Sequence, residues 1–485
     1  MTESRTAIIA ADGTYTYADL DDASQRVAGA LLGDNEDLNQ TRVAFLISPS
    51  FAYTAVQRGI WRAGGVAVPL AVSHPPPELE YVIRDSGASV VVADRACAPR
   101  VSVLARAARA RFVAVSDALK AQPAQGLPHL GSARRAMIIY TSGTTGRPKG
   151  AVTSHQNIGA QIASLIEAWR WTPADRLLLA LPLHHVHGII NGLGSALAVR
   201  ATCEILPEFD AEVVWSRLQS GEVTVFTAVP TMYHRLIASW DAAPSEVKRA
   251  RSEGARRLRL MMSGSAALPV TTLERWRDIT GHTLLERYGM TEIGMALSNP
   301  IAGERRPGRV GQPLPEVEVR VVDEHGALVA DGSPGELEVR GATVFMEYWQ
   351  REDETRAAFR DGWFRTGDVA VLEEGSYRLL GRTSVDIIKT GGYKVSALEI
   401  EEVLRLHPAI AECAVVGVAD DDWGERVAAA VELRAGAALS LDELQAWAKS
   451  QLAPYKIPRA LEEVAALPRN AMGKVVKPQV AGLFK

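Results

Sequence analysis

The residues from Tyr140 to Gly150 combine the chemical groups that bind phosphate. The stretch reads YTSGTTGRPKG, in which glycines lie among hydroxyl side chains and a lysine follows a proline. Glycine lets the backbone approach an anion, hydroxyls donate hydrogen bonds, and lysine supplies a positive charge. A nucleotide-switch loop would need Gly-Lys-Ser/Thr at the start of a helix, whereas Lys149 follows Pro148 and precedes a strand-like run. We therefore predict a phosphate loop between two strands. By itself the stretch also fits a solvated hairpin.

Four further polar motifs follow this loop along the chain. They are ERYGMTE at 286–292, WFRTGD at 363–368, GRTSVDIIKTGGYKV at 381–395 and LPRNAMGKVVK at 467–477. Singly, each has an ordinary explanation, such as a helix cap for Thr291, a turn for Asp368 or a surface position for Lys474. In this order, the five motifs resemble the adenylate-forming superfamily, which includes acyl-CoA synthetases, peptide-synthetase adenylation domains and beetle luciferases. The resemblance runs from about Thr16 to Lys477.

The resemblance implies a reaction in two halves, with ATP, Mg²⁺ and coenzyme A as the partners of a small carboxylic acid. The carboxylate attacks the α-phosphorus of ATP, which gives an acyl-adenylate and pyrophosphate. The thiol of coenzyme A then attacks the acyl carbon and releases AMP. Because the first half brings two anions together, it requires cations and hydrogen-bond donors that are placed in advance.

The phosphate and metal contacts are assigned by resemblance. The loop from Thr141 to Lys149 would hold the β- and γ-phosphates. Glu292 would bind Mg²⁺ with Thr145 as a second ligand, and Thr291 would lie near the phosphate oxygens. Thr145 and Glu292 are therefore predicted to be catalytic. The other loop residues in the predicted nucleotide site are Ser142, Gly143, Thr144 and Gly146.

The adenosine contacts are also implied by the resemblance. Asp368 would accept hydrogen bonds from the ribose hydroxyls with the help of Arg382, and Tyr288 would stack near the base. Lys474, the third predicted catalytic residue, would bridge the attacking carboxylate and the phosphate. The segment MMSGSAALP matches the adenine-pocket loop. The remaining residues of the predicted nucleotide site are Gly264, Ser265, Ala266, Glu286, Arg287 and Gly289.

The second half-reaction requires the C-terminal lid to rotate, so that Lys474 leaves and KTGGYKV faces the site. Gly391 and Gly392 would then line the pantetheine channel, because glycine permits close backbone approach. Lys394 is a candidate contact for the phosphates of coenzyme A. Relatives usually carry Asp or Lys at the hinge, just after the Gly-Arg pair, whereas this chain has Ser384.

Arg287 is the residue that indicates the class of acid. Relatives for fatty or aryl acids usually have a small or apolar residue at this position. A guanidinium beside an alkyl tail would be a buried unpaired charge that costs several kcal/mol. A second carboxylate on the substrate would instead bind it in a bidentate pair. The predicted acid-binding residues are His185, His187, Ser263, Arg287 and Met290.

Two structural alternatives remain for this site. Arg287 could turn outward to a glutamate such as Glu286, and His185 and His187 could be satisfied core histidines. Within the superfamily, LERYGMTE and LPLHHVHG most resemble the malonyl-CoA synthetases. That resemblance implies malonate as the substrate, with methylmalonate as a plausible second, and Met290 or Ile190 would set the size of the 2-substituent.

Other functions stay open. The chain could be an acyl-CoA ligase for another short-chain or aryl acid, or an adenylation enzyme that loads a carrier-protein thiol. The run LPLHHVHGI lacks the Asp that would meet an amino-acid ammonium, and no carrier segment follows Lys474. A non-catalytic nucleotide-binding protein is the third alternative, and the presence of Lys474 and Glu292 argues against it.

The elements that must position these residues alternate between helix and strand. Runs such as TRVAFLI, VAVPL and VTVFTAVP read as buried strands, and helical patterns separate them. This alternation predicts mostly parallel sheets covered by helices. From about Pro315, short strands joined by glycine turns predict a small antiparallel β unit. After Arg382 a compact segment reads as helix, hairpin and helix.

The predicted fold class is therefore α/β. A large N-terminal domain of helix-covered, mostly parallel sheets carries the small β unit, and a small mobile α+β lid follows. A chain of 485 residues exceeds the roughly 250–300 residues of a single core. We predict an N-terminal domain over 1–381, a hinge over 382–384 and a lid domain over 385–485.

The composition excludes several classes of partner. Net charge is −4 with both signs spread along the chain, so no nucleic-acid partner is expected. The three cysteines are far apart, which argues against disulfides or a zinc site and favours a reducing compartment. No signal peptide and no membrane segment is expected, so we predict a cytoplasmic protein. The sequence leaves monomer and dimer open.

Overall fold

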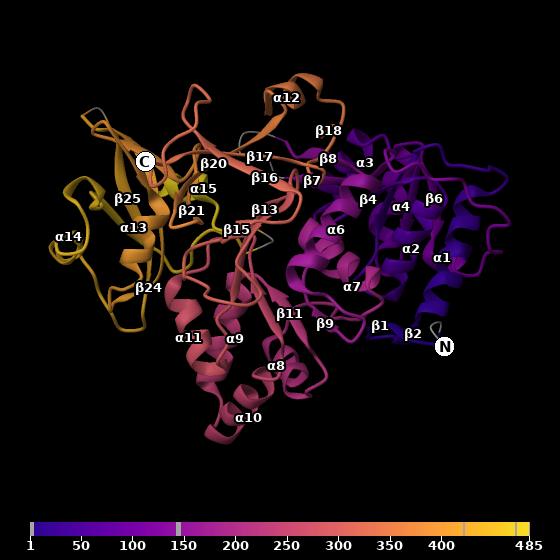
Figure 1. Ribbon diagram of the computed structural model, residues 1–485, viewed down its shortest axis with the longest axis horizontal. Helices are drawn as coiled ribbons and strands as arrows, with labels where there is room; N and C mark the ends of the chain where they lie inside the picture. The colour runs from indigo at the N-terminus through magenta and orange to yellow at the C-terminus, as the bar shows by residue number, and fades with distance from the viewer. Residues whose placement is uncertain (1–3, 142–146, 421, 471–472, 485) are drawn as a thin grey trace.

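The computed structural model describes all residues except 1–3, 142–146, 421, 471–472 and 485. In Figure 1 the chain begins at the right, passes through a lower central region, and ends at the left, where the C-terminal residues gather. The two families of elements that the sequence predicts, parallel sheets first and antiparallel hairpins later, occupy separate parts of the molecule.

The first sheet has seven strands and holds the ends of the phosphate loop. Its four pairings from β7 to β6 are parallel, as the buried strand–helix repeats predict, and the two pairings at the opposite edge are antiparallel. The strand order is β18 (Glu347–Tyr348), β8 (Lys149–Ser154), β7 (Arg135–Thr141), β4 (Val66–Pro69), β3 (Arg42–Leu46), β5 (Val90–Ala93) and β6 (Arg111–Ala114).

The second sheet has nine strands and carries the ERYGMTE motif. Its centre is parallel, and antiparallel strands close both edges. The strand order is β15 (Gln312–Pro313), β14 (Gly294–Ser298), β13 (Leu285–Met290), β12 (Leu260–Ser263), β11 (Val225–Ala228), β9 (Arg176–Leu179), β10 (Thr202–Ile205), β1 (Thr6–Ala10) and β2 (Gly13–Thr16).

A third, antiparallel sheet forms the predicted small β unit. Asp368 and Arg382 face each other across one of its strand pairs, so the pairing itself joins two of the motifs. Its strands are β16 (Val317–Val322), β17 (Gly335–Gly341), β19 (Phe359–Arg360), β20 (Trp363–Glu373) and β21 (Ser376–Arg382).

The C-terminal sheet packs on cores of its own. Their buried residues run from Ile388 to Val480, whereas those of the largest core end at Tyr377. The predicted hairpin is the antiparallel pair β24 and β25. The hinge at 382–384 stays a prediction. The strands are β22 (Ile387–Thr390), β23 (Tyr393–Ser396), β24 (Ile410–Asp420), β25 (Gly424–Leu433) and β26 (Ala460–Glu463).

Helices cover the sheets, and polar caps begin several of them. Thr16, Ser154 and Ser440 each form a capping box with the residue three positions later. The helices before residue 300 are α1 (Tyr17–Leu32), α2 (Phe51–Arg62), α3 (Pro76–Asp85), α4 (Ala98–Ala107), α5 (Val115–Ala118), α6 (His155–Trp169), α7 (Ser195–Ala198), α8 (Ala211–Gln219), α9 (Pro230–Ala242), α10 (Ser245–Ala255) and α11 (Val270–Thr280).

The later helices are short, and one earlier segment is a π-helix. The run LPLHHVHGI leads into this π-helix, η1 (His187–Gly194), which the sequence did not predict. Wider helical turns of this kind are frequent at functional sites. The later helices are α12 (Glu352–Ala357), α13 (Ala397–Leu404), α14 (Leu441–Ala448), the 3₁₀ turns η2 (Pro454–Lys456) and η3 (Gly482–Phe484), and α15 (Lys477–Ala481).

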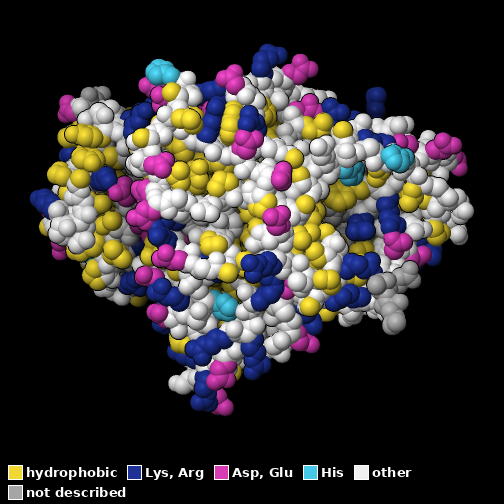
Figure 2. Space-filling model, viewed as in Figure 1, with side chains coloured by type: hydrophobic (Ala, Val, Ile, Leu, Met, Phe, Trp, Pro, Cys, Tyr) yellow, Lys and Arg dark blue, Asp and Glu magenta, His cyan; other side chains and the backbone are white. Residues whose placement is uncertain are grey.

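The predicted fold class is confirmed by this arrangement of mostly parallel and antiparallel sheets. Figure 2 shows that basic and acidic side chains are interspersed over the face in view, as the small net charge of −4 leads one to expect. Within the described part of the chain, no helix has the length and apolar character needed to cross a membrane.

Candidate active site

Three neighbouring parallel strands bring polar side chains together at one edge of the nine-stranded sheet. Thr227 in β11, Ser263 in β12 and Arg287 in β13 lie at or just beyond the carboxyl ends of the paired segments. All three are buried, with exposed fractions of 2%, 1% and 4%. The carboxyl edge of a parallel sheet is where α/β proteins usually bind ligands.

Uncharged groups hold the guanidinium of Arg287. Its Nη2 donates to Nε2 of His187 and, at 3.0 Å, to Oγ1 of Thr227. Its Nη1 lies 3.7 Å from the sulfur of Met295, and its central carbon lies 5.7 Å from a ring centre of Trp169, a cation–π distance. Nε of Arg287 is buried without a hydrogen-bond partner among the described residues.

His187 is a neutral donor and acceptor in this cluster. Its Nδ1 lies 3.0 Å from Oγ of Ser265, and its Nε2 lies 2.8 Å from Oγ1 of Thr227. Burial first, and Arg287 second, hold the pKa of the imidazole well below its ordinary value. Because Nε2 accepts from Arg287, we assign the ring proton to Nδ1, which donates to Ser265. The positive charge of the cluster therefore comes from Arg287.

Arg287 has no carboxylate partner in the part of the chain that the structure describes. The neighbouring Glu286 points to the other face of β13, where its Oε1 accepts from the amide of Gly308 at 3.0 Å. The alternative that Arg287 turns outward to Glu286 is therefore wrong. Burial lowers the pKa of Arg287 to about 9, because its charge is out of water without a neighbouring anion. The cluster therefore carries a buried positive charge that no carboxylate of the described residues pairs with.

Gly264 makes room for this guanidinium. A Cβ atom at that position would lie 2.5 Å from Nη1 of Arg287, so a side chain there would displace the charge. Ser265 follows with a φ of 70° and contacts His187. The loop assigned by resemblance to the adenine pocket therefore also shapes the Arg287 pocket, a contact that the sequence did not predict. Ala266 is exposed beside it.

A second cluster joins Tyr288, Asp368 and Arg382. Oδ2 of Asp368 accepts from the hydroxyl of Tyr288 at 2.6 Å, and Oδ1 accepts from Nε of Arg382 at 2.9 Å. Asp368 is 8% exposed, so its carboxylate is largely buried and is held by these two partners. Residues from three motifs that are distant in sequence are thus brought together, although their contacts with a nucleotide stay predictions.

Glu292 is a buried carboxylate at the edge between two sheets. Its Oε1 accepts from the hydroxyl of Tyr348 at 3.0 Å, and its main-chain oxygen accepts from the amide of Phe345 at 2.7 Å. Burial raises the pKa of Glu292. Thr291 lines a small pocket beside it together with Gly294. Gly289 and Met290 lie in the irregular pairing of β13 with β14, where a Cβ at Gly289 would meet a backbone oxygen at 2.1 Å.

The two ends of the phosphate loop are paired strands, so the prediction of a loop between strands is confirmed. Thr141 ends β7 and pairs with Lys149, which begins β8. Lys149 forms an ion pair with Glu354 of α12, and its Nζ lies 5.3 Å from the ring centre of Tyr348. The loop residues between these ends lie outside the described residues, namely Ser142, Gly143, Thr144, Thr145 and Gly146.

Lys474 reaches these clusters from the C-terminal part of the chain. Its side chain is exposed, yet the nearby protein first, and Arg382 second, lower the pKa of its ammonium, whereas Asp368 acts to raise it. Burial first, and Lys474 second, lower the pKa of His185 to about 4. Nε2 of His185 is buried without a partner among the described residues. Lys474 therefore lies close enough to His185 and to the Asp368 cluster for their charges to interact, and we call the region between them the cleft.

The hairpin proposed for the second half-reaction lies on the surface. Gly391 and Gly392 form the tip between β22 and β23, with φ values of 56° and 83°, and both are exposed. Lys394 is exposed next to them, as is Ser384 in the predicted hinge. In this structure Lys474, and not the double glycine, is in the cleft.

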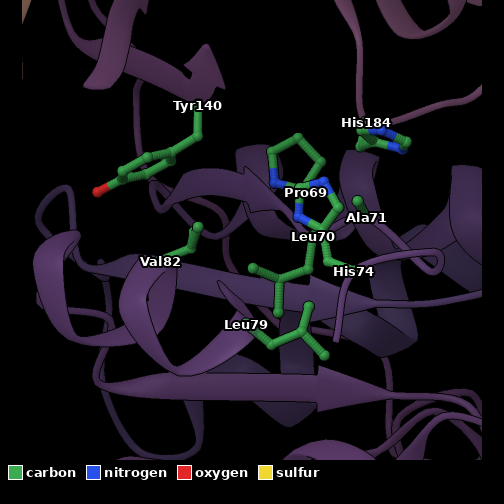
Figure 3. A pocket seen from close by; sticks show the side chains of 8 residues that line it. All are labelled: Pro69, Leu70, Ala71, His74, Leu79, Val82, Tyr140 and His184. Atoms are coloured by element: carbon green, nitrogen blue, oxygen red, sulfur yellow. The ribbon is translucent and has the colours of Figure 1, made fainter. Parts of the chain in front are cut away.

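His184 lines a different pocket from its two histidine neighbours. Figure 3 shows this pocket, which is walled by Pro69, Leu70, His74, Tyr140 and His184 among others. The ring centre of His184 lies 5.9 Å from that of His74 and 4.0 Å from that of His185. Burial lowers the pKa of His184 to about 2, so it is neutral. The run LPLHHVHGI thus contributes His184 to this pocket, and it places His187 beside Arg287 and His185 near Lys474.

Sequence reasoning missed three residues of the site. Thr227 is the one polar residue in the apolar strand VFTA, which was the available signal. Trp169 ends α6 and backs Arg287, and no local pattern marks it. Tyr348 lies in a two-residue strand at the sheet edge and binds Glu292, a contact that depends on distant pairing.

Comparison with known proteins agrees with this geometry. The sequence pattern of the family described as AMP-binding enzyme matches residues 1–349, and that of the AMP-binding enzyme C-terminal domain matches residues 399–474. The chain belongs to the AMP-binding enzyme family. The first pattern includes Lys149, Arg287 and Glu292, and the second ends at Lys474, whereas Asp368 and Arg382 lie between the two matched segments.

Individual members of the family are similar over nearly the whole chain. The mitochondrial malonate–CoA ligase ACSF3 of Xenopus laevis is 48% identical over 98% of this chain and 89% of that protein. The crystal structure of ATP-bound MatB from Rhodopseudomonas palustris has a TM-score of 0.93 at 36% identity, covering 99% of this chain and 96% of that chain. The apo structure of MatB has a TM-score of 0.82 at the same identity and coverage.

Proposed function

We propose that this protein is an AMP-forming acid–thiol ligase that makes malonyl-CoA from malonate, ATP and coenzyme A. The observation that carries the malonate assignment is the buried guanidinium of Arg287, which has no carboxylate partner among the described residues. A second carboxylate on the substrate would supply the missing anion and accept two parallel hydrogen bonds. The similarity to malonate–CoA ligases over 98% of the chain supports the same activity.

In the first half-reaction, one malonate carboxylate binds Arg287 while the other points toward Lys474. Thr227 and His187 hold the guanidinium in place, and Ser263, whose hydroxyl is buried and has no partner among the residues that the structure describes, can donate to the bound acid. The ammonium of Lys474 then lies between the attacking oxygen and the α-phosphate and offsets the charge that develops there. The uncharged His185 adds no repulsion to the approach of Lys474.

The nucleotide would lie along the remaining motifs. Asp368 has one carboxylate oxygen on Tyr288 and one on Arg382, and each oxygen retains a lone pair for a ribose hydroxyl. Lys149 would exchange Glu354 for the terminal phosphates. The cleft then excludes water from the acyl-adenylate while Lys474 stays in place.

Glu292 fits the proposed Mg²⁺ site by its chemistry. It is a buried carboxylate whose pKa is raised because burial disfavours its charged form. A bound cation would stabilise that charged form. Mg²⁺ prefers one or two carboxylates together with phosphate oxygens. When bound, the ion would neutralise phosphate charge during attack. No group of three or more metal-ligating side chains exists among the described residues, which also favours a site completed by phosphate.

The second half-reaction would bring the Gly391–Gly392 tip to the cleft after the lid rotates. Lys394, next to that tip, would contact the phosphates of coenzyme A. Methylmalonate is proposed as a second substrate, limited in size by Met290 and Ile190. The cytoplasmic location and the choice between monomer and dimer remain predictions from sequence. The Xenopus relative is named as mitochondrial.

A pyrophosphate-release assay with malonate, methylmalonate, acetate, succinate and benzoate tests this function, with thioester formation followed in parallel. We expect malonate to give the highest kcat/KM, methylmalonate to follow, and the three other acids to react slowly. Comparable rates with acetate and malonate would contradict the assignment of Arg287. Pyrophosphate release without a coenzyme A thioester would favour the alternative of a carrier-loading enzyme.

A further inference from the structure

A tight turn presents Lys474 to the cleft. The amide of Asn470 donates to the oxygen of Lys474 at 2.9 Å, and the amide of Lys474 donates to the side-chain oxygen of Asn470 at 3.0 Å. Gly473 has a φ of 76°, and its missing side chain lets the turn approach Thr231 at the start of α9. The main chain at Lys474 is therefore fixed by its own turn and by contact with the N-terminal part.

Arg469 clamps this turn from the other side. Its Nη1 donates to the main-chain oxygen of Gly473 at 2.9 Å, the residue next to Lys474. Its Nη2 lies 3.5 Å from a carboxylate oxygen of Glu412 in β24. Arg469 also forms an isolated β-bridge with Val475. One guanidinium thus ties the lysine turn to the C-terminal sheet.

The clamp continues into a chain of ion pairs that reaches the predicted hinge. Glu412 also accepts from Arg405 at 2.9 Å, and Arg405 lies 3.5 Å from Glu401. Glu401 is 4% exposed and pairs with Lys477, which lies 3.4 Å from Asp386. Asp386 accepts from the amide of Arg382 at 3.0 Å. Charged groups therefore connect the turn of Lys474 with the segment about which the lid would rotate.

We propose that Arg469 is a positioning residue that sets Lys474 for the adenylation half-reaction. It acts through the oxygen of Gly473 and is anchored by Glu412. A planar guanidinium can hold two acceptors in fixed directions, which a lysine ammonium does with less definition. This inference rests on the proposed function, because it requires that Lys474 acts at the α-phosphate.

The role belongs to one half-reaction only. In the thioester-forming arrangement Lys474 has left the cleft, so the precision of its turn no longer matters for the transfer to coenzyme A. Loss of a purely structural contact would instead weaken the whole lid and slow both halves. The ratio of the two rates separates positioning from stability.

The experiment compares Arg469→Ala, Arg469→Lys and Lys474→Ala with the wild type. Adenylation is followed by pyrophosphate release, and transfer is followed by reaction of supplied malonyl-adenylate with coenzyme A. Arg434→Ala is the matched control, because this arginine lies on the same lid and is exposed. We expect Arg469→Ala to lower the kcat of adenylation about 100-fold, the scale of a 1 Å misplacement. Arg469→Lys should recover part of this loss, and transfer should stay within about twofold of wild type in both variants.

Three outcomes decide the matter. If Arg469→Ala slows both halves equally, or if Arg469→Lys restores nothing while Arg469→Ala slows transfer, the residue is structural and the inference is overturned. If Arg469→Ala leaves adenylation unchanged while Lys474→Ala abolishes it, Arg469 does not position the lysine, and the proposed function stands. If Lys474→Ala retains adenylation, the assignment of the lysine itself is wrong.

Discussion

A buried positive charge with no carboxylate partner among the described residues separates this site from one built for an apolar acid. Arg287 is held by Thr227, His187 and the face of Trp169, which orient its guanidinium without cancelling its charge. A carboxylate of the protein at this place would have oriented the guanidinium and also neutralised its charge. No free charge would then remain to bind the substrate. The neutral His187 matters for the same reason, because a second cation beside Arg287 would repel it.

Glu286 predicts a pH dependence of stability at the residue scale. Burial raises its pKa from 4.5 to about 8, so the stability it contributes is present below pH 4.5 and is lost as pH rises through 8. Glu286→Gln is neutral at every pH and keeps an oxygen for the amide of Gly308. The thermal midpoint of this variant should rise relative to that of wild type as the pH increases from 5 to 9. The change should correspond to about 1–3 kcal/mol in the free energy of unfolding.

The exposed Glu246→Gln is the control for this series, and its midpoint should follow that of wild type across the range. A constant difference between Glu286→Gln and wild type from pH 5 to pH 9 would show that Glu286 does not titrate in this window.

At the residue scale, the sequence could predict which types of residue belong to the site. It could not predict which side chains contact one another. ERYGMTE indicates a buried arginine next to a glutamate, and Arg287 and Glu286 turned out to face opposite sides of one strand. That follows from strand alternation once β13 is placed, whereas the contact with Thr227 depends on which strand is the neighbour. Ser265 shows the same limit, since its partner His187 lies 78 positions away.

At the element scale, the decisive feature is the backbone geometry at the tip of a short hairpin. The β22–β23 tip has two consecutive glycines with positive φ, a geometry suited to a two-residue hairpin turn. A Cβ at Gly391 would lie 2.9 Å from the ring of Trp423, whereas a Cβ at Gly392 would meet no atom of the described residues within 4 Å.

Gly392→Ala tests the role of this tip. A non-glycine residue in the left-handed region costs about 1–2 kcal/mol, so a modest loss of stability is expected. If the tip lines the pantetheine channel, the added methyl should slow transfer from malonyl-adenylate to coenzyme A by about tenfold or more and leave adenylation near wild type. Gly436→Ala is matched, because that lid glycine also has positive φ and open space around it. Equal effects of the two variants on transfer would contradict the assignment of Gly392 to the pantetheine channel.

Periodicity predicted most elements because it reports which faces are buried. The repeats of buried strand and amphipathic helix gave the parallel sheets, and β24–β25 matched the predicted hairpin. The π-helix at His187–Gly194 was not predictable in this way, because its apolar run fits a strand or a helix equally well. The order of strands within each sheet also depends on long-range packing that local patterns do not encode.

At the scale of the whole molecule, the C-terminal part is docked with Lys474 in the cleft. The amide of Val270 at the start of α11 donates to Glu402 of α13 at 3.1 Å, and Gly473 lies against Thr231. We infer that this arrangement is the one suited to adenylation.

A disulfide between Thr231→Cys and Gly473→Cys would test this inference. A Cβ at Gly473 would lie 3.6 Å from the Cβ of Thr231, within the usual span of a disulfide. The three native cysteines are buried, so the engineered pair should oxidise selectively. The oxidised variant should keep adenylation at or near the level of its reduced form and lose transfer to coenzyme A, and reduction should restore transfer. Full transfer by the oxidised variant would show that no rotation of the lid is needed.

The most direct test of the account is the ratio of kcat/KM for malonate to that for acetate, measured in wild type and in Arg287→Met. Because acetate lacks the second carboxylate, its kcat/KM depends on every step except recognition by Arg287. We predict that the variant loses about 2–5 kcal/mol with malonate, roughly 30-fold or more, and changes little with acetate. A ratio near one in wild type, or a high ratio that survives in Arg287→Met, would contradict the claim that Arg287 selects a dicarboxylate.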